Sequence, residues 1–301
     1  MNDLIIIGGG PAGLTAAIYA IRKRLNVMLI SKDLGGKTNY RLSLPWVEDY
    51  QVIRGLEIVS KFRNELEYLE YARHLDSVEH VSHKDKTFIV KTKDGKEYKA
   101  KSLIVASGTR QVRLEVPGEK EYAMKGVCYS ALSYAPLFID KKAVVIGNDE
   151  LALRAAGELA TVARHVTLIT EADGQMKTGL GRKLSTAKNV TVLEKHSVIE
   201  VKGDTYARTV IAKDAAGKIH EIAADGTFVE MALTPNTQML GDLVKLDSQG
   251  RIVVDNSNRT SLPGVFAAGD VTNTYAEQVL VAIGDGAKAA LSAYDYLLPT
   301  L

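Results

Sequence analysis

Cysteine is almost absent, because the 301-residue chain contains only Cys128. One cysteine cannot form a disulfide within the chain, which excludes a disulfide-stapled scaffold and fits a reducing cytoplasm. An excess of one charge is missing too, since 38 basic residues stand against 36 acidic ones. The net charge of +2 gives no reason to expect nucleic acid or an anionic membrane as a partner.

The chain also lacks an uninterrupted membrane span. Leu4 to Ile21 carries no charge and has about the length of a span, but four glycines and Pro11 interrupt it. The basic start and cleavage site of a signal peptide are missing as well. We therefore predict a buried strand that turns into a helix, and a cytoplasmic protein without a targeting signal. The length suffices for two domains of ordinary size.

A glycine-rich turn follows the first apolar run. The apolar residues 4–7 are typical of a strand buried on both faces, and Gly8, Gly10 and Gly13 then form the pattern G-x-G-x-x-G. An alanine-rich helix to about Arg24 and a second strand, "NVMLI", complete a βαβ unit. Such a turn binds the pyrophosphate of a dinucleotide at the helix N-terminus. The acidic residue expected for the ribose is replaced by Ser31, and Asp33 is two positions displaced.

The C-terminal part carries the more specific motif. A short strand, 265–267, leads through Gly269 to Asp270, and a helix follows. This arrangement resembles the flavin-closing motif of the thioredoxin reductase family, which includes the reductase component of alkyl hydroperoxide reductase. The resemblance implies that Asp270 binds the ribityl and phosphate region of FAD and that Gln278 lies beside the pyrimidine edge of the flavin.

Further motifs of that family occur in order along the chain. They are "LGGKT" at 34–38, "VEDY" at 47–50, "IVASGTR" at 104–110 and "TPNT" at 234–237. The resemblance covers essentially the whole chain and implies FAD as cofactor. The implied FAD-binding residues are Gly8, Gly10, Pro11, Ala12, Gly13, Gly35, Gly36, Lys37, Asp49, Ala106, Ser107, Gly108, Gly269, Asp270, Glu277, Gln278 and Val279. Glu277 replaces a residue that is usually basic in the family.

The resemblance implies an α/β protein made of two doubly wound, Rossmann-like domains, the second inserted in the first. Two loops rich in charge and turn residues, 113–121 and 241–251, match the two crossings. We predict that residues 1–116 and 244–301 form the FAD domain and that 117–243 form the inserted nicotinamide-type domain. Asp94-Gly95, between alternating segments, predicts a hairpin in the first domain.

The inserted domain has the layout of a second dinucleotide site with altered chemistry. Its turn runs from Gly147 to Ala152, and Asp149 stands where the family has its middle glycine. A carboxylate there repels a pyrophosphate. The basic run that binds the 2′-phosphate of NADPH is replaced by 170–173, "TEAD". We predict that NADPH does not bind, and NADH held by Glu171 stays an alternative.

The redox cysteines of the family are also missing. Their positions, just after Tyr129 and before the second turn, are occupied by Ser130 and Ser133. A serine hydroxyl forms no disulfide, so this chain cannot run the dithiol relay of the family. Either a natural member has lost the pair, or the sequence is a Cys-to-Ser form of a disulfide reductase. Cys128 is expected to be an ordinary buried thiol.

These features predict an FAD-dependent oxidoreductase reduced by a small redox protein such as ferredoxin or flavodoxin. In its losses the chain resembles ferredoxin-linked, NADPH-independent thioredoxin reductases. A thioredoxin-like acceptor is expected only if the cysteine pair is restored. An NADH-dependent flavin oxidase or ferredoxin reductase and a non-catalytic flavin-binding protein remain as alternatives. The resemblance implies a homodimer. The six histidines show no spacing typical of a metal site, and none is predicted.

Overall fold

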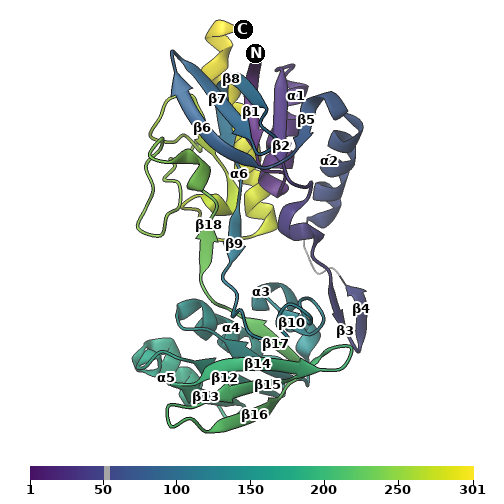
Figure 1. The fold of residues 1–301 in the computed structure, drawn as a ribbon, viewed down its shortest axis with the longest axis vertical. Helices are drawn as coiled ribbons and strands as arrows, with labels where there is room; N and C mark the ends of the chain where they lie inside the picture. The colour runs from purple at the N-terminus through teal and green to yellow at the C-terminus, as the bar shows by residue number, and fades with distance from the viewer. Residues whose placement is uncertain (51–54) are drawn as a thin grey trace. The chain divides into compact units, whose positions relative to one another are not determined.

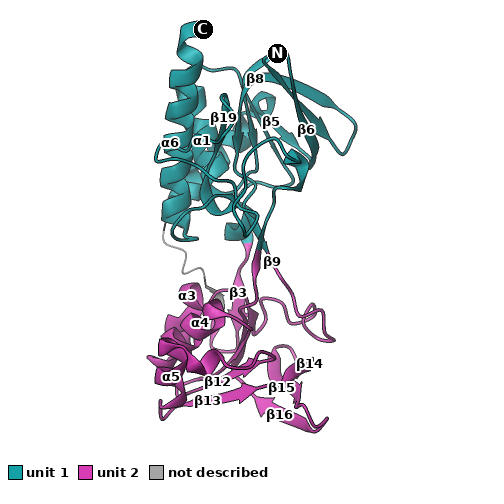
Figure 2. Cartoon of the chain, turned by 90° about the vertical axis from the view of Figure 1, so that its left-hand side faces the viewer, with its two compact units in different colours: residues 1–39, 53–110, 234–301 teal, residues 40–52, 111–233 magenta. Residues whose placement is uncertain are grey.

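The computed structural model describes residues 1–50 and 55–301, and the side chains of all of these except 48–50. Contacts between residues divide the chain into two compact units (Figure 2). Unit 1 comprises 1–39, 53–110 and 234–301, and unit 2 comprises 40–52 and 111–233. The domain boundaries inferred from the motifs, at 116/117 and 243/244, remain a prediction beside this division by contacts.

A mainly parallel sheet forms the centre of unit 1, with the strand order β5-β2-β1-β8-β7-β6 (Figure 1). The first four of these strands run parallel, whereas β6 and β7 form an antiparallel hairpin beside β8. Strand β19 also pairs with β8, in parallel along 103–105. The bounds are β1 (Asn2–Ile7), β2 (Val27–Ser31), β5 (Arg73–Leu75), β6 (Val78–Lys84), β7 (Thr87–Thr92), β8 (Glu97–Val105) and β19 (Val265–Ala267).

The alternation of side chains along β1 supplies two cores. Leu4 and Ile6 pack with three helices, α1 (Pro11–Arg22), α2 (Leu56–Tyr68) and α6 (Val279–Leu297). Ile5 and Ile7 pack on the opposite face with apolar residues of the β6–β7 hairpin and of the segment 239–254. Because both faces are covered, the strand is apolar at every position from 4 to 7.

Unit 2 repeats the plan with a five-stranded parallel sheet of order β10-β17-β11-β12-β13. Val145 packs on the side of helices α3, α4 and α5, and Val144 and Ile146 pack against a three-stranded antiparallel sheet, β14-β15-β16. The helices are α3 (Ala131–Tyr134), α4 (Glu150–Ala160) and α5 (Gly179–Ser185). The strands are β10 (Val127–Cys128), β11 (Lys142–Ile146), β12 (His165–Thr170), β13 (Val190–Glu194), β14 (Ser197–Gly203), β15 (Ala207–Lys213), β16 (Ile219–Ala223) and β17 (Gly226–Val229).

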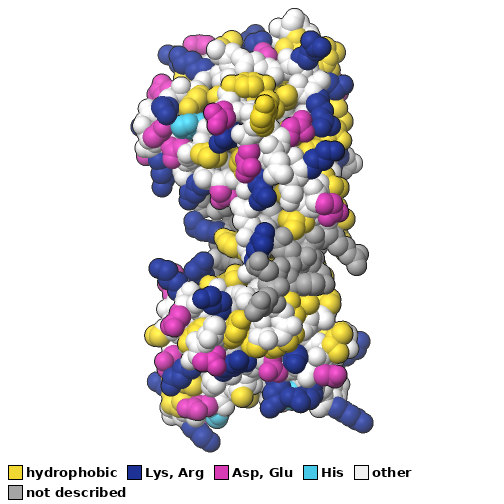
Figure 3. Space-filling model, turned by 90° about the vertical axis from the view of Figure 1, so that its right-hand side faces the viewer, with side chains coloured by type: hydrophobic (Ala, Val, Ile, Leu, Met, Phe, Trp, Pro, Cys, Tyr) yellow, Lys and Arg dark blue, Asp and Glu magenta, His cyan; other side chains and the backbone are white. Residues whose placement is uncertain are grey.

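The α/β class with two Rossmann-like sheets, predicted from the sequence, is confirmed. Two short strand pairs complete the description: β3 (Leu42–Leu44) with β4 (Val47–Tyr50), and β9 (Thr109–Gln111) with β18 (Leu233–Pro235). Basic and acidic side chains are interspersed on the face drawn in Figure 3, as the nearly balanced composition leads one to expect. None of the helices in the described part of the chain has the length and apolar character that a membrane span requires.

The contact between α1 and α6 depends on a glycine, which leads to a prediction. A Cβ at Gly286 would collide with the carbonyl oxygen of Ala12, whereas a Cβ at Gly284 on the same helix meets nothing within 4 Å. We expect Gly286→Ala to lower the free energy of unfolding by about 1–3 kcal/mol through overpacking. The control Gly284→Ala should leave it unchanged or raise it by up to about 1 kcal/mol, because alanine favours the helix. Urea unfolding followed by circular dichroism measures both; equal effects would contradict this packing.

Candidate functional site

The first glycine turn brings bare backbone to the start of α1. Gly8 has a φ of 111°, and a Cβ there would collide with the carbonyl oxygen of Ala106. A Cβ at Gly13 would collide with the carbonyl oxygen of Gly8. Gly10 is different, because the space where its Cβ would stand is open to 4 Å. Two glycines therefore allow close packing, and the third leaves room beside the backbone for a ligand.

The N-terminus of α1 is uncapped. Its N-cap residue is Gly10, no side chain accepts a hydrogen bond from the first turn, and that turn contains no acidic residue. Pro11 occupies the first helical position, where a missing N–H costs nothing. The free amides and the positive end of the helix dipole are therefore available to an anion such as a pyrophosphate.

A second segment closes on the glycine turn from the end of β2. The amide of Gly35 donates to the carbonyl of Gly9 at 2.7 Å. A Cβ at Gly36 would stand 3.2 Å from the Cα of Gly10. Gly36 begins a 3-10 turn, Gly36–Asn39, that carries Lys37 into the site.

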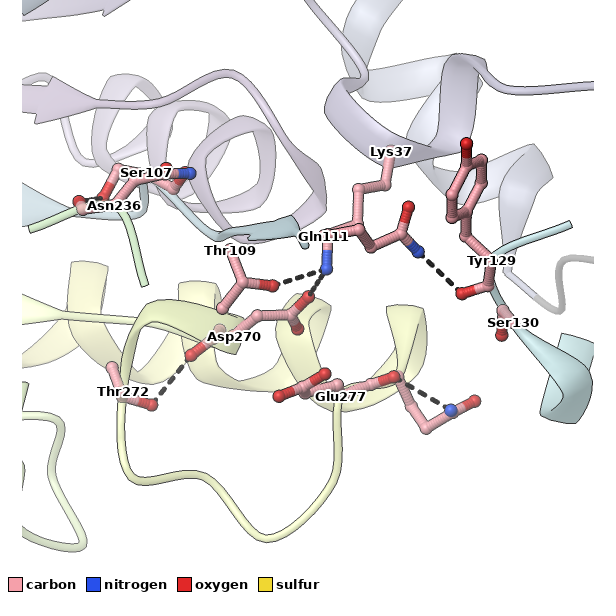
Figure 4. Close-up of polar contacts among 12 residues, drawn as sticks. Lys37, Ser107, Thr109, Gln111, Tyr129, Ser130, Asn236, Asp270, Thr272 and Glu277 are labelled. Carbon is pink, nitrogen blue, oxygen red and sulfur yellow. Dashed lines mark hydrogen bonds and ion pairs between the residues drawn. The ribbon is translucent and has the colours of Figure 1, made fainter. Parts of the chain in front are cut away.

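Lys37 joins this segment to the C-terminal motif. Its ammonium lies 2.9 Å from Asp270 Oδ2 and donates to Thr109 Oγ1 at 2.6 Å (Figure 4). The side chain of Asp270 is 18% exposed, so the ion pair is partly shielded from water. Gly269, with a φ of 74°, passes so close to α1 that a Cβ would stand 3.0 Å from the Cβ of Ala12. Three segments far apart in the sequence thus meet at one helix terminus.

The end of β8 is held by Asn236, which lies in the "TPNT" motif but was not among the predicted FAD-binding residues. The amide of Ala106 donates to the carbonyl of Ile7 at 2.8 Å. Beyond it, Ser107 Oγ donates to the carbonyl of Asn236 at 2.6 Å, and Asn236 Nδ2 donates back to the carbonyl of Ser107 at 2.9 Å. Asn236 also donates its amide to the carbonyl of Gly108. Through these three contacts Asn236 anchors the loop that follows β8.

The start of α6 adds a second uncapped helix terminus and a partly buried acid. Gln278 is the N-cap, and its side chain donates to the carbonyl of Glu277 without capping the helix, which begins at Val279. Glu277 forms an ion pair with Arg251 at 2.8 Å. Burial and the charge of Asp270 raise the pKa of Glu277, while Lys37 and Arg251 act in the opposite direction. Arg251, which no sequence motif indicated, compensates the acid that replaces a usually basic residue.

The residues of unit 1 fit a bound FAD. An uncapped α1, the open space at Gly10 and the turn at Asp270 provide a place for a pyrophosphate and a polar chain. The expected acid for the ribose is engaged elsewhere: Asp33 Oδ1 accepts from the amide of Gly36, and Ser31 Oγ accepts from the amide of Gly9. The side chain of Asp49, the remaining predicted contact, lies outside the described residues.

The second glycine turn, at the end of β11, differs from the first in its polar contacts. Gly147 still permits close packing, since a Cβ there would collide with the backbone of Glu230. However, Asp149 is the N-cap of α4, and its Oδ1 accepts from the amide of Leu151 at 2.9 Å. Glu150 adds a second acid in the first turn. The Leu151 amide, which could otherwise bind a phosphate, is thus already bonded to a carboxylate. The positive end of the helix dipole already faces acidic side chains.

The end of β12 and the residue after it are hydrogen-bonded to Asn148 of this turn. Asn148 Oδ1 accepts from the amide of Glu171 at 2.9 Å and from Thr170 Oγ1 at 3.2 Å. No hydrogen bond or ion pair from another described residue engages the carboxylate of Glu171. An exposed carboxylate at this position suits the hydroxyls of an unphosphorylated ribose and repels a 2′-phosphate.

The two serines of unit 2 face each other. Ser130 Oγ lies 3.0 Å from Ser133 Oγ, and Ser130 is the N-cap of α3. Their side chains therefore converge as those of a cysteine pair would. Cys128 is completely buried, and both burial and the charge of Glu230 raise its pKa. A thiol that is inaccessible and protonated cannot take over the role of the missing pair.

Comparison with known proteins agrees with this geometry. The sequence model of the family described as "Pyridine nucleotide-disulphide oxidoreductase" matches residues 2–286. The F component of alkyl hydroperoxide reductase from Pseudomonas aeruginosa is 38% identical over 310 residues, and the match covers 99% of this chain and 58% of that protein. An NADH dehydrogenase of Bacillus subtilis is 33% identical, with 98% and 58% covered. The chain thus spans less than two thirds of these curated relatives.

A solved structure covers the chain almost completely. The thioredoxin reductase of Streptococcus pyogenes has a TM-score of 0.88 and 33% identity, and the match covers 99% of both chains. The thioredoxin reductase of T. acidophilum is 34% identical with a TM-score of 0.64 and the same coverage.

The ion pair at the C-terminal motif predicts the effect of removing one carboxylate. Asp270→Ala should yield protein with most of its flavin lost, because Lys37 loses its anionic partner and the turn at Gly269 loses its polar anchor. The control Asp295→Ala removes an exposed carboxylate from α6 and should keep its flavin. Flavin absorbance relative to protein absorbance after purification measures the difference. Full flavin content in Asp270→Ala would contradict the assignment.

Because the two serine side chains face each other, cysteines at the same positions are expected to form a disulfide. The double variant Ser130→Cys, Ser133→Cys should form one under a mild oxidant, since only a small rotation is needed to bring two sulfur atoms into bonding distance. Thiol titration in denaturant should then fall from three groups, including Cys128, to one. Ser130→Cys alone should keep two thiols in both states. Three free thiols after oxidation would show that the two positions are not paired.

Proposed function

This chain belongs to the pyridine nucleotide-disulphide oxidoreductase family, and on that premise we propose that it is an FAD-dependent electron-transfer enzyme that does not use NADPH. Its electron donor is a small redox protein such as ferredoxin or flavodoxin. Its acceptor is not a disulfide substrate of the dithiol relay, because serines occupy positions 130 and 133.

The contrast between two helix termini supports this proposal. Helix α1 starts at Gly10 without a cap or an acid, and helix α4 starts at Asp149 with both. The two turns belong to the same architecture, and both N-cap residues have extended backbone, so the contrast in caps and charges comes from their side chains. A dinucleotide phosphate is attracted to the first terminus. At the second it meets the carboxylate of Asp149 and an amide already bonded to it, beside Glu150, which is paired with Arg154.

Different segments of unit 1 would bind different parts of FAD. The turn from Gly8 to Gly13 would take the pyrophosphate on the amides of α1, and Asp270, paired with Lys37, would orient the polar chain toward the start of α6. Bound FAD supplies a ring that accepts and passes on electrons. Arg251 and Glu277 neutralise each other, so the start of α6 keeps the positive end of its dipole without an unpaired acid beside it.

NADH is a second candidate donor, favoured by two observations. The carboxylate of Glu171 follows β12 directly, where a ribose carboxylate is expected in a Rossmann-like unit. The relative from Bacillus subtilis bears the name NADH dehydrogenase. In this case the cap at Asp149 would have to open before a pyrophosphate could bind.

An anaerobic titration separates these possibilities. Purified yellow protein receives an excess of NADPH, then of NADH, then dithionite as a control, and a second sample receives reduced ferredoxin or flavodoxin, while the flavin absorbance is followed. We expect reduction by dithionite and by reduced ferredoxin or flavodoxin, and no reduction by NADPH. Rapid bleaching by NADPH would overturn the proposal, and bleaching by NADH alone would select the second candidate. A flavin that only dithionite reduces would indicate a non-catalytic flavin-binding protein.

The capping carboxylate can be tested in the same assay. Asp149→Gly removes the cap and restores a glycine in the middle of the turn, so the rate of flavin reduction by NADH should rise. Glu150→Gln is the matched control, because it removes a neighbouring charge from the same helix turn, keeps an oxygen that can accept from Arg154 and leaves the bond between Asp149 and Leu151 intact. Equal rates for the two variants would show that the cap is not what limits nucleotide binding.

A further inference from the structure

A cluster of two histidines and an aspartate lies in unit 2, outside every motif discussed so far. His196, Asp214 and His220 each offer a ligand atom, and these atoms all lie within 4.8 Å of one another. The antiparallel register explains the meeting. Ser197 pairs with Lys213, and Lys213 pairs with Ile219, so the three residues adjoin one row across β14, β15 and β16.

Hydrogen bonds already orient two of the three side chains. Asp214 Oδ1 accepts from the amides of Ala216 and Lys218, both at 2.9 Å, which directs Oδ2 toward His220 Nε2 at 2.9 Å. His196 Nδ1 lies 2.7 Å from the carbonyl oxygen of Glu194. A carbonyl only accepts, so Nδ1 carries the proton, and in the neutral ring Nε2 keeps its lone pair. Metal-binding histidines and carboxylates are typically supported in this way.

The donor set has a defined chemical preference. Two imidazole nitrogens and one carboxylate oxygen suit Zn²⁺, with water in the fourth position. The rings of His196 and His220 meet edge to face, with centroids 5.1 Å apart. An ion would take the place of the proton shared by Asp214 Oδ2 and His220 Nε2, so zinc binding releases that proton, while the turn amides keep their bonds to Asp214 Oδ1. The side chains of Asp214 and His220 are 22% and 30% exposed, so an ion could enter from solvent.

A second cluster of possible metal ligands, in unit 1, is a less suitable metal site because a lysine is bound to it. His74, Asp76 and Asp94 also bring their ligand atoms together. There, however, the ammonium of Lys96 lies 2.9 Å from Asp94 Oδ2, the same oxygen that His74 approaches at 3.2 Å. A lysine already neutralises that carboxylate. Among the ion pairs of the described residues, Asp214 has only His220 as a partner.

We propose that His196, Asp214 and His220 form a binding site for Zn²⁺ that joins the start of β14 to the turn between β15 and β16. The sheet that the ion would tie together covers one face of the parallel sheet in unit 2, with Val201, Val210 and Ala212 in the shared core. The site is independent of FAD and of the proposed electron donor.

Zinc titration of the holoprotein tests the site. Protein freed of metal with a chelator is titrated with Zn²⁺ in competition with a chromophoric chelator. We expect one ion per chain, and a loss of affinity of at least about 100-fold in His196→Ala, His220→Ala and Asp214→Asn. Asp214→Asn keeps the oxygen that accepts from the turn, so its fold should be retained. His165→Ala, which removes a histidine bonded to Thr191 in the same unit, is the control and should bind as the parent does.

The coordination sphere gives a second measurement that does not depend on any variant. X-ray absorption of the zinc-loaded protein should show about four nitrogen or oxygen neighbours at about 2.0 Å with an imidazole pattern and no sulfur. A sulfur neighbour at about 2.3 Å would place the ion at Cys128 instead and overturn the proposal. The absence of stoichiometric binding, or equal binding by the parent, His220→Ala and His165→Ala, would overturn it as well.

Discussion

The close approach of β1, α1 and α6 is the constraint on which unit 1 depends. Gly8, Gly13 and Gly286 each stand where a methyl group would strike a carbonyl oxygen. Their bare backbone lets α1 lie against the sheet on one side and against α6 on the other. The first turn of α1 is thereby held at one place, and the segments that carry Lys37 and Asp270 can meet in front of it. A ligand held by backbone amides requires such a fixed helix, because amides cannot adjust their position as long side chains do.

The two units place different polar atoms on the same architecture. Both glycine turns keep the glycine that packs a helix onto a strand. Only the second has acquired a side chain that caps its helix, and capping stabilises the helix by about 0.5–2 kcal/mol. In the function that we propose, the interaction that strengthens α4 as a structural element is also the one that opposes a phosphate at its N-terminus. The facing serines follow the same pattern, since they keep the local geometry and have lost the redox chemistry.

Sequence patterns predicted secondary structure and turns, which depend on neighbouring residues, but not contacts between residues far apart in the chain. The βαβ unit, the Asp94-Gly95 hairpin and the short strand before Asp270 are confirmed, because apolar periodicity and turn residues act over a few positions. The sequence also identified Asp149, but as a residue that repels phosphate and not as a helix cap. The contacts of Asn236, Thr109 and Arg251 were missed, although the first two residues lie in predicted motifs, because their partners lie far away along the chain. The cluster around His220 was missed for the same reason, since the register of a sheet and not sequence spacing brings it together.

The ion pair between Lys37 and Asp270 has a consequence for synthesis of the protein. Its members are 233 residues apart, which a ribosome needs about 10–50 s to translate at about 5–20 residues per second. During that interval every residue of unit 2 is synthesised, and α6 of unit 1 follows only after Asp270. The apolar face of α1 that packs against α6 therefore stays exposed in the nascent chain until α6 has been synthesised. The contact between Lys37 and Asp270 at the flavin site consequently forms only after unit 2 has been synthesised.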